Sequence, residues 1–118
     1  MYSVRFYRDK SGHRPALEYL HEIADGKDKD SRIRATKMQD YINLLREYGT
    51  SIGEPVVKHI EGDIWELRPA RDRVLFVAWD GNGYVLLHGF EKHTQKTPER
   101  EKERARAEYK DLKERGLK

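Results

Sequence analysis

Basic side chains gather where three short apolar runs in the middle of the chain begin or end. Arg68 and Arg73 stand on either side of a turn that contains Pro69, and Lys92 and His93 follow the last run. Packing alone does not require so many cations near one sheet, whereas binding of a phosphate does. Arginine suits that task because its planar guanidinium group can bind two phosphate oxygens at once. These residues therefore predict an anion site that forms only on folding.

Metal-free cleavage of RNA is a reaction that such a set of residues could perform. RNA carries its own nucleophile, the 2′-hydroxyl, so an enzyme must deprotonate it, stabilise the crowded phosphorane and protonate the leaving 5′-oxygen. We assign the second task to Arg68 and Arg73. The general base and the general acid stay open among Glu66, Lys92, His93 and Lys96. A lysine could act as the base because neighbouring cations lower its pKa.

The candidate site residues therefore form two groups. Our candidate catalytic residues are Arg68, Arg73, Lys92 and His93. Our candidate RNA contacts are Lys58, His59, Glu66 and Lys96. One alternative is that Glu66 and Arg68 form only a surface ion pair, worth less than about 1 kcal/mol. We expect Arg73 to be a surface side chain, so that its replacement by alanine leaves the fold intact.

Three runs of strand length must position these residues. In Asp63–Arg68, Trp65 and Leu67 point to one face while Glu66 and Arg68 point to the other. The other two runs, residues 73–79 and 84–90, are rich in Val, Phe, Leu and aromatic residues. They are separated by Asp-Gly-Asn-Gly, which predicts a hairpin because these residues tolerate positive φ.

Two amphipathic helices are expected before these strands. Pro15 suits the first position of a helix, and Gly26 suits its C-terminal end. The second helix is expected to be capped by Asp30 or Ser31 and to end at Gly49. Its apolar face consists of Met38, Tyr41, Ile42, Leu45 and Tyr48.

A charged helix is expected at residues 98–115. Thr97 should cap it with its hydroxyl, and Pro98 suits its first position. Its apolar stripe consists of Ala105, Tyr109 and Leu112. Because that stripe is thin, we expect this helix to be the least stable element.

These elements, with a first strand at Tyr2–Arg8, predict an α+β fold. The expected sheet is twisted and mostly antiparallel, with the two N-terminal helices packed on one face and a C-terminal helix after the last strand. We expect the other face to remain partly open. At 14.0 kDa, residues 1–118 are expected to form one domain.

The composition excludes several functions. The absence of cysteine rules out disulfides, thiolate zinc sites and cysteine nucleophiles. The five histidines show no paired ligand spacing, and no phosphate-binding glycine loop is present, so we expect no metal and no cofactor. The net charge of +3 permits nucleic-acid binding without requiring it.

The first ten residues lack the apolar segment of a signal peptide, and no apolar run approaches the roughly 18 residues of a membrane span. We therefore expect a cytoplasmic protein without membrane contact.

The runs WELRPARDRVLFVAW and VLLHGFEKHTQKTP, followed by a charged helix, resemble the HigB-type toxins of the RelE/ParE superfamily. The resemblance is to the phage-derived, RelE-like branch of bacterial type II toxin–antitoxin systems, and it covers nearly the whole chain. It implies a RelE-like fold and a ribosome-dependent mRNA endonuclease (mRNA interferase) that inhibits translation. The family pattern assigns functional roles to Arg68, Arg73, Lys92 and Lys96. One departure is Lys92-His93, where the family often has two basic residues, Lys-Lys or Lys-Arg.

The resemblance also implies partners. These are a cognate helix-turn-helix antitoxin of the HigA type, the ribosome and mRNA, and promoter DNA bound through the antitoxin. Two alternatives remain: inhibition of DNA gyrase, as in the ParE arm of the superfamily, and a non-catalytic binding module that docks an acidic partner. The basic cluster after Phe90 favours the ribonuclease.

Overall fold

The computed structural model describes residues 1–117 of the chain. In chain order its elements are β1 (Ser3–Phe6), α1 (Pro15–Ala24), α2 (Lys29–Tyr48), the 3-10 helix η1 (Gly49–Ile52), β2 (Val57–Glu61), β3 (Ile64–Leu67), β4 (Asp72–Trp79), β5 (Gly83–Glu91) and α3 (Glu99–Arg115). The predicted α+β class is confirmed. Within the described residues the strands form one five-stranded sheet in the order β1-β5-β4-β3-β2.

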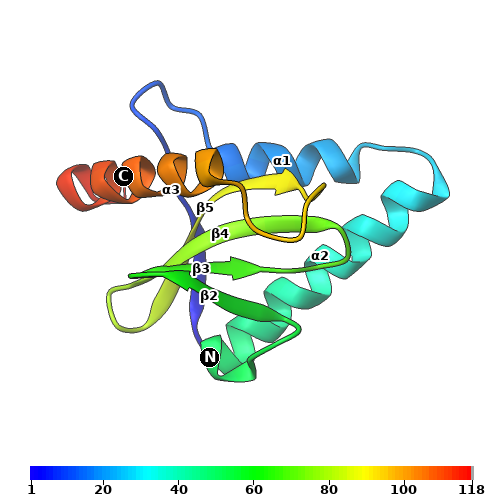
Figure 1. The fold of residues 1–118 in the computed structure, drawn as a ribbon, viewed down its shortest axis with the longest axis horizontal. Helices are drawn as coiled ribbons and strands as arrows, with labels where there is room; N and C mark the ends of the chain where they lie inside the picture. Colours follow the sequence, from blue (N-terminus) through cyan, green and yellow to red (C-terminus); the bar gives the residue numbers. More distant parts are fainter. Residues whose placement is uncertain (118) are drawn as a thin grey trace.

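The sheet is mixed, and its antiparallel part carries the candidate site. Strands β2 to β5 pair as successive antiparallel neighbours, whereas β1 pairs in parallel with β5 (Figure 1). The predicted hairpin joins β4 to β5, and both Asp80 and Gly81 have positive φ, at 58° and 65°. Two consecutive positive φ values match the right-handed twist of the strands. The longest antiparallel pair of the sheet therefore lies next to β3, with its glutamate and arginine.

Helices α1 and α2 cover one face of the sheet, as predicted. Met38 and Leu45 of α2 pack in one cluster with Leu67 of β3 and Phe76 of β4, all of them buried. Tyr48, which we assigned to the apolar face of α2, is instead half exposed. Because Leu67 faces these helices, the alternation along β3 places Glu66 on the opposite face.

Helix α3 covers that opposite face, so the prediction of a partly open face is wrong for most of its area. Ala105 and Leu112 of α3 are buried in a second cluster with Leu75, Val77 and Leu87. Figure 1 shows α3 running across this side of the sheet at the β5 end. The thin apolar stripe suffices because polar contacts also join this helix to the sheet.

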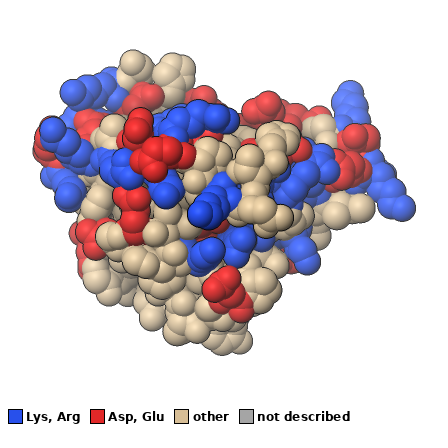
Figure 2. Space-filling view, in the orientation of Figure 1, with Lys and Arg blue, Asp and Glu red and all other residues tan. Residues whose placement is uncertain are grey.

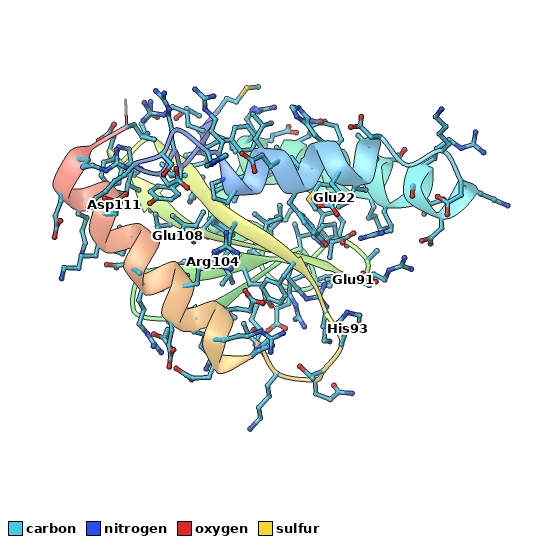
Figure 3. All side chains as sticks on the ribbon, turned by 90° about the horizontal axis from the view of Figure 1, so that it is seen from above. Glu22, Glu91, His93, Arg104, Glu108 and Asp111 are labelled. Atoms are coloured by element: carbon cyan, nitrogen blue, oxygen red, sulfur yellow. The ribbon has the colours of Figure 1, made fainter. Side chains whose placement is uncertain are left out.

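The first of these contacts is made by His88 of β5, which is 1% exposed. Its Nδ1 lies 2.5 Å from Oε1 of Glu108, and its Nε2 lies 3.0 Å from Oε1 of Glu101. Both ring nitrogens of this buried histidine therefore have a carboxylate partner on α3. Arg104 pairs with the second oxygen of Glu108 at 3.3 Å, and Figure 3 shows both residues on the side of α3 that faces the sheet. His88 is thus a hydrogen-bonded histidine of the core.

Two partly buried carboxylates connect the same helix to the fold further along. Asp111 accepts hydrogen bonds from Arg115 and, at 2.6 Å, from the hydroxyl of Tyr7. Arg106 donates to both oxygens of Glu61, at 2.6 and 2.9 Å. These hydrogen bonds lower the pKa of Asp111 well below its usual value of 3.8 and the pKa of Glu61 below 4.5. Both carboxylates therefore join α3 to the rest of the fold most strongly while they are ionised.

This arrangement predicts that acid loosens α3. A carboxylate whose pKa is lower in the folded state adds stability above its unfolded pKa and loses it as the pH falls through the folded value. We expect the thermal midpoint to be steady from about pH 6 to about pH 5 and to fall below about pH 4. Asp111→Asn should show a smaller fall than the wild type in circular dichroism melts. An equally steep fall in Asp111→Asn would contradict this role for Asp111.

The helix caps differ from those expected. The N-cap of α2 is Asp28, whose side chain accepts from the backbone nitrogen of Ser31 at 3.0 Å. The helix starts earlier than predicted, so Asp30 lies in its first turn. The N-cap of α3 is Pro98, without any side-chain cap. The hydroxyl of Thr97 is therefore available for another contact.

No helix within residues 1–117 is long and apolar enough to cross a lipid bilayer.

Candidate active site

A hollow of about 240 Å³ lies beside the start of α3, where strands β2 to β5 and the loop before that helix meet. It is lined by Lys58, His59, Ile60, Glu66, Arg68, Arg73, Phe90, Lys92, Gln95, Lys96, Thr97 and Lys102. Six of these side chains are Lys or Arg, and one is an acid. Figure 2 shows Lys and Arg side chains gathered near the middle of this face. The hollow is thus suited to an anion.

Glu66 lies at the base of this hollow and is only 3% exposed. Its Oε1 lies 3.5 Å from Nε of Arg68 and 3.7 Å from Nε of Arg73. Its Oε2 accepts a hydrogen bond of 2.8 Å from the hydroxyl of Thr97. The alternative of an exposed ion pair between Glu66 and Arg68 is therefore wrong, because the carboxylate is buried among three partners.

Arg73 is buried too, with 7% of its surface exposed, so the prediction of a surface arginine is wrong. Its Nη1 donates to the carbonyl oxygens of Ala70, at 2.9 Å, and Asp72, at 2.7 Å. Burial lowers the pKa of Arg73, Glu66 opposes that shift, and the charge of Arg68 adds to it. Replacing Arg73 by alanine would therefore disturb the turn between β3 and β4 as well as the site.

A second buried network holds the backbone beside Arg73. Asp72 is fully buried and accepts from Nε and Nη2 of Arg34 on α2, at 3.0 and 2.6 Å. The hydroxyl of Tyr19 on α1 donates to the same carboxylate. The hydrogen bond to Asp72 raises the pKa of Arg34 above its usual value, and burial raises that of Tyr19. Both N-terminal helices thus fix the first residue of β4, and with it the guanidinium that follows.

The hydrogen-bond donors of Arg68 are not all used within the protein. Its side chain is 20% exposed, and its Nη1 lies 3.3 Å from Oε1 of Glu54. Its Nε is the one buried side-chain nitrogen or oxygen without a hydrogen-bond partner in the described part of the chain. A distance of 3.5 Å to Glu66 is long for a charge-assisted hydrogen bond, which is normally below about 2.9 Å. The protein thus does not saturate this guanidinium, and the exposed part of the side chain, which lines the hollow, can bind a phosphate.

The loop after β5 supplies two of the lysines. Its start is held by the backbone nitrogen of Lys92, which donates to the carbonyl of Arg71 at 2.8 Å. Lys92 and Lys96 both line the hollow, whereas His93 does not. Figure 3 shows His93 beyond Glu91, well apart from the middle of α3. The structure therefore brings seven of the eight candidate residues together and leaves out His93, which lines a neighbouring depression.

On the other wall, β2 contributes the remaining candidates. Lys58 pairs in register with Glu66, and His59 with Trp65. The His59 ring packs edge-on against Trp65, with 5.1 Å between ring centroids, and its Nε2 lies 2.7 Å from the carbonyl oxygen of Gly62. These contacts hold the imidazole at the rim of the hollow.

Residues 19–110 match the family described as Phage derived protein Gp49-like (DUF891). The chain belongs to this family. No protein with a curated description matches it.

The Gp49-like family is a RelE-like toxin family, associated with toxin–antitoxin systems, and it indicates an antitoxin as partner. The matched segment contains all the residues that line the hollow. It also contains Arg34 and Asp72, whose hydrogen bonds fix the backbone next to Arg73. Membership thus covers both the candidate site and the residues that support it.

Sequence reasoning missed several residues of the site in this Gp49-like chain. Thr97 was assigned to a helix cap, although a hydroxyl just before Pro98 could equally face the sheet. Lys102 follows Pro98 by one turn of helix, a spacing that could have placed its charge beside the loop. The lining residues not predicted as site residues are Ile60, Phe90, Gln95, Thr97 and Lys102.

The site does not offer a set of metal ligands. Within residues 1–117, no group of three His, Cys, Asp or Glu could hold a metal ion. Glu66 and His59 are the potential ligands of the hollow, and the other charged groups there are cations. What the arrangement can do is bind an anion and hold one carboxylate against it.

Proposed function

We propose that this protein is the toxin of a type II toxin–antitoxin system and that it cleaves mRNA on the translating ribosome without a metal. The observation that carries the proposal is the buried carboxylate of Glu66, with one oxygen near the guanidinium groups of Arg68 and Arg73. This group lies in a hollow with six basic side chains, as the reaction of a phosphodiester would need. Membership of a RelE-like toxin family supports the same function.

In this mechanism Glu66 is the general base and removes the proton of the 2′-hydroxyl. The 2′-oxygen then forms a bond to phosphorus, and the bond between phosphorus and the 5′-oxygen breaks. Arg68 and Arg73 stabilise the charge on the phosphorane, since their donors are already in place before the reaction. The burial of Glu66 and Arg73 supports this assignment because electrostatic interactions are stronger away from water.

Lys92 is the proposed general acid, which protonates the leaving 5′-oxygen. It lines the same hollow as Glu66, whereas His93 lies outside it. Lys58, His59 and Lys96 are proposed to bind the RNA backbone on either side of the reacting phosphate. Charge on the walls of the hollow makes binding sensitive to salt.

The proposed partners follow from the toxin assignment. A helix-turn-helix antitoxin of the HigA type would neutralise the protein and carry the complex to promoter DNA. The ribosome would present the mRNA.

A translating extract that contains a reporter mRNA tests the proposal, with primer extension to locate new ends. Cleavage that appears only during translation supports it, while inhibited DNA supercoiling without cleavage would identify a gyrase inhibitor instead. The absence of both cleavage and supercoiling inhibition would indicate a non-catalytic binding module.

A further prediction concerns metal ions. Because the hollow provides only two potential ligands, protein treated with EDTA and then desalted should cleave mRNA at the rate of untreated protein when added to magnesium-containing ribosomes. The control is untreated protein passed through the same column. Loss of activity that zinc or manganese restores specifically would contradict the metal-free mechanism.

A further inference from the structure

We propose that Thr97 is a positioning residue, whose hydroxyl holds the Glu66 carboxylate in the orientation needed at the candidate active site. This inference rests on the proposed function, in which that carboxylate is the base. Thr97 lies between α3 and the basic loop, which follows β5 and carries Lys92 and Lys96. The mechanism above gives Thr97 no role.

The hydrogen bond spans a large separation in sequence. Thr97 Oγ1 donates to Glu66 Oε2 at 2.8 Å, and the two residues are 31 positions apart. The other oxygen of the carboxylate lies near Arg68 and Arg73. A carboxylate rotates easily about its last bond, because this torsion has only a broad preference. With one oxygen held by a hydroxyl and the other by two cations, the plane of the Glu66 carboxylate is fixed.

The hydroxyl is free for this contact because it does not cap the helix. Helix α3 begins with Pro98 as its N-cap and without a side-chain hydrogen bond, although threonine is a favoured capping residue. The chain thus leaves this helix uncapped and uses the hydroxyl for a buried acid on the sheet. A contact that served helix stability alone would be expected at the helix end instead.

The same bond closes the basic loop. The backbone nitrogen of Lys92 fixes the start of the loop to Arg71, and the hydroxyl of Thr94 donates to the carbonyl of Lys96 at 2.7 Å inside it. Thr97 ties the far end of the loop to the strand that carries Glu66. Glu66 and the lysines of the loop are therefore held in fixed positions relative to one another.

Two substitutions separate the hydroxyl from the rest of the side chain. Thr97→Val keeps the shape and removes the donor, whereas Thr97→Ser keeps the donor. We expect Thr97→Val to reduce the cleavage rate on the order of 10-fold, as for loss of one hydrogen bond to a charged group. The pH–rate profile of Thr97→Val should also differ from that of the wild type, because a hydrogen bond to the carboxylate is lost. Thr97→Ser should restore the rate and the profile.

Thr94→Val is the matched control, since it removes a hydroxyl from the same loop that does not touch Glu66. Its pH–rate profile should coincide with that of the wild type. Wild-type rate and profile in Thr97→Val would overturn the proposal. Equal losses in Thr97→Val and Thr97→Ser with an unshifted profile would also overturn it, because they would show a purely structural role.

A measurement that does not depend on cleavage separates this inference from the proposed function. In protein labelled with ¹³C-glutamate, the carboxyl signal of Glu66, assigned by its loss in Glu66→Gln, should shift in Thr97→Val. It should keep its position in Thr97→Ser. If the wild type cleaves no RNA, the proposed function fails, yet this shift still shows the contact. An unmoved carboxyl signal in Thr97→Val would overturn the positioning role whether or not RNA is cleaved.

Discussion

Replacing Glu66 by glutamine should reduce mRNA cleavage by about 100- to 10,000-fold, the range expected for loss of a general base. The amide has nearly the same shape as the carboxylate and can still accept a hydrogen bond from Thr97. It cannot remove a proton from the 2′-hydroxyl. The substitution therefore removes the chemistry while keeping most of the local packing.

This variant should also melt at a lower temperature than the wild type. Arg68 and the buried Arg73 lose their carboxylate partner, and a buried charge without a partner destabilises the folded state. Cleavage should therefore be compared at a temperature at which thermal melts show both proteins to be folded. Glu47→Gln, at an exposed position of α2, is the matched control and should cleave at the wild-type rate. Undiminished cleavage by Glu66→Gln would remove Glu66 from the mechanism.

Replacing His88 by leucine should have the largest effect on stability. The side chain lies between the carboxylates of Glu101 and Glu108, at 3.0 and 2.5 Å. Leucine leaves both acids without this partner, and Glu108 is itself only 7% exposed. Removal of one partner from a buried ionic contact costs about 3–5 kcal/mol. We expect the free energy of unfolding to fall by that amount in urea denaturation.

The matched control for this prediction is Glu103→Gln, at an exposed position of α3. It should change the free energy of unfolding by less than about 0.5 kcal/mol, as surface substitutions usually do. Hydrogen exchange adds a second readout, because α3 should lose protection in His88→Leu more than α2 does. A wild-type denaturation curve for His88→Leu would show that this contact does not hold α3 on the sheet.

Local patterns predicted much of the site. The alternation in β3 placed Glu66 and Arg68 on the face opposite Leu67, and the glycine-containing turn after Trp79 predicted the β4–β5 hairpin. Spacing across Pro69 brought Arg68 close to Arg73, as their shared partner, Oε1 of Glu66, shows. These inferences succeeded because side-chain direction along a strand and turn chemistry depend only on near neighbours.

What could not be predicted depends on contacts between distant segments. Arg73 is buried by the turn carbonyls and by the support of Asp72 from α1 and α2, and no local pattern reveals that support. The placement of α3 depends on His88, whose partners lie 13 and 20 residues away. Thr97 has the sequence position of a helix cap, but its hydroxyl bonds to Glu66. In each case a polar side chain has a distant partner that hydrophobic periodicity does not indicate.

The central claim is cleavage by attack of the 2′-hydroxyl, and the chemical ends of the products test it most directly. Reporter mRNA recovered from a translating extract treated with the wild-type protein should carry a 2′,3′-cyclic phosphate on the upstream fragment. The downstream fragment should begin with a 5′-hydroxyl, and Glu66→Gln should yield neither end above background. Intact mRNA in the presence of folded protein, or fragments that begin with a 5′-phosphate, would contradict the mechanism.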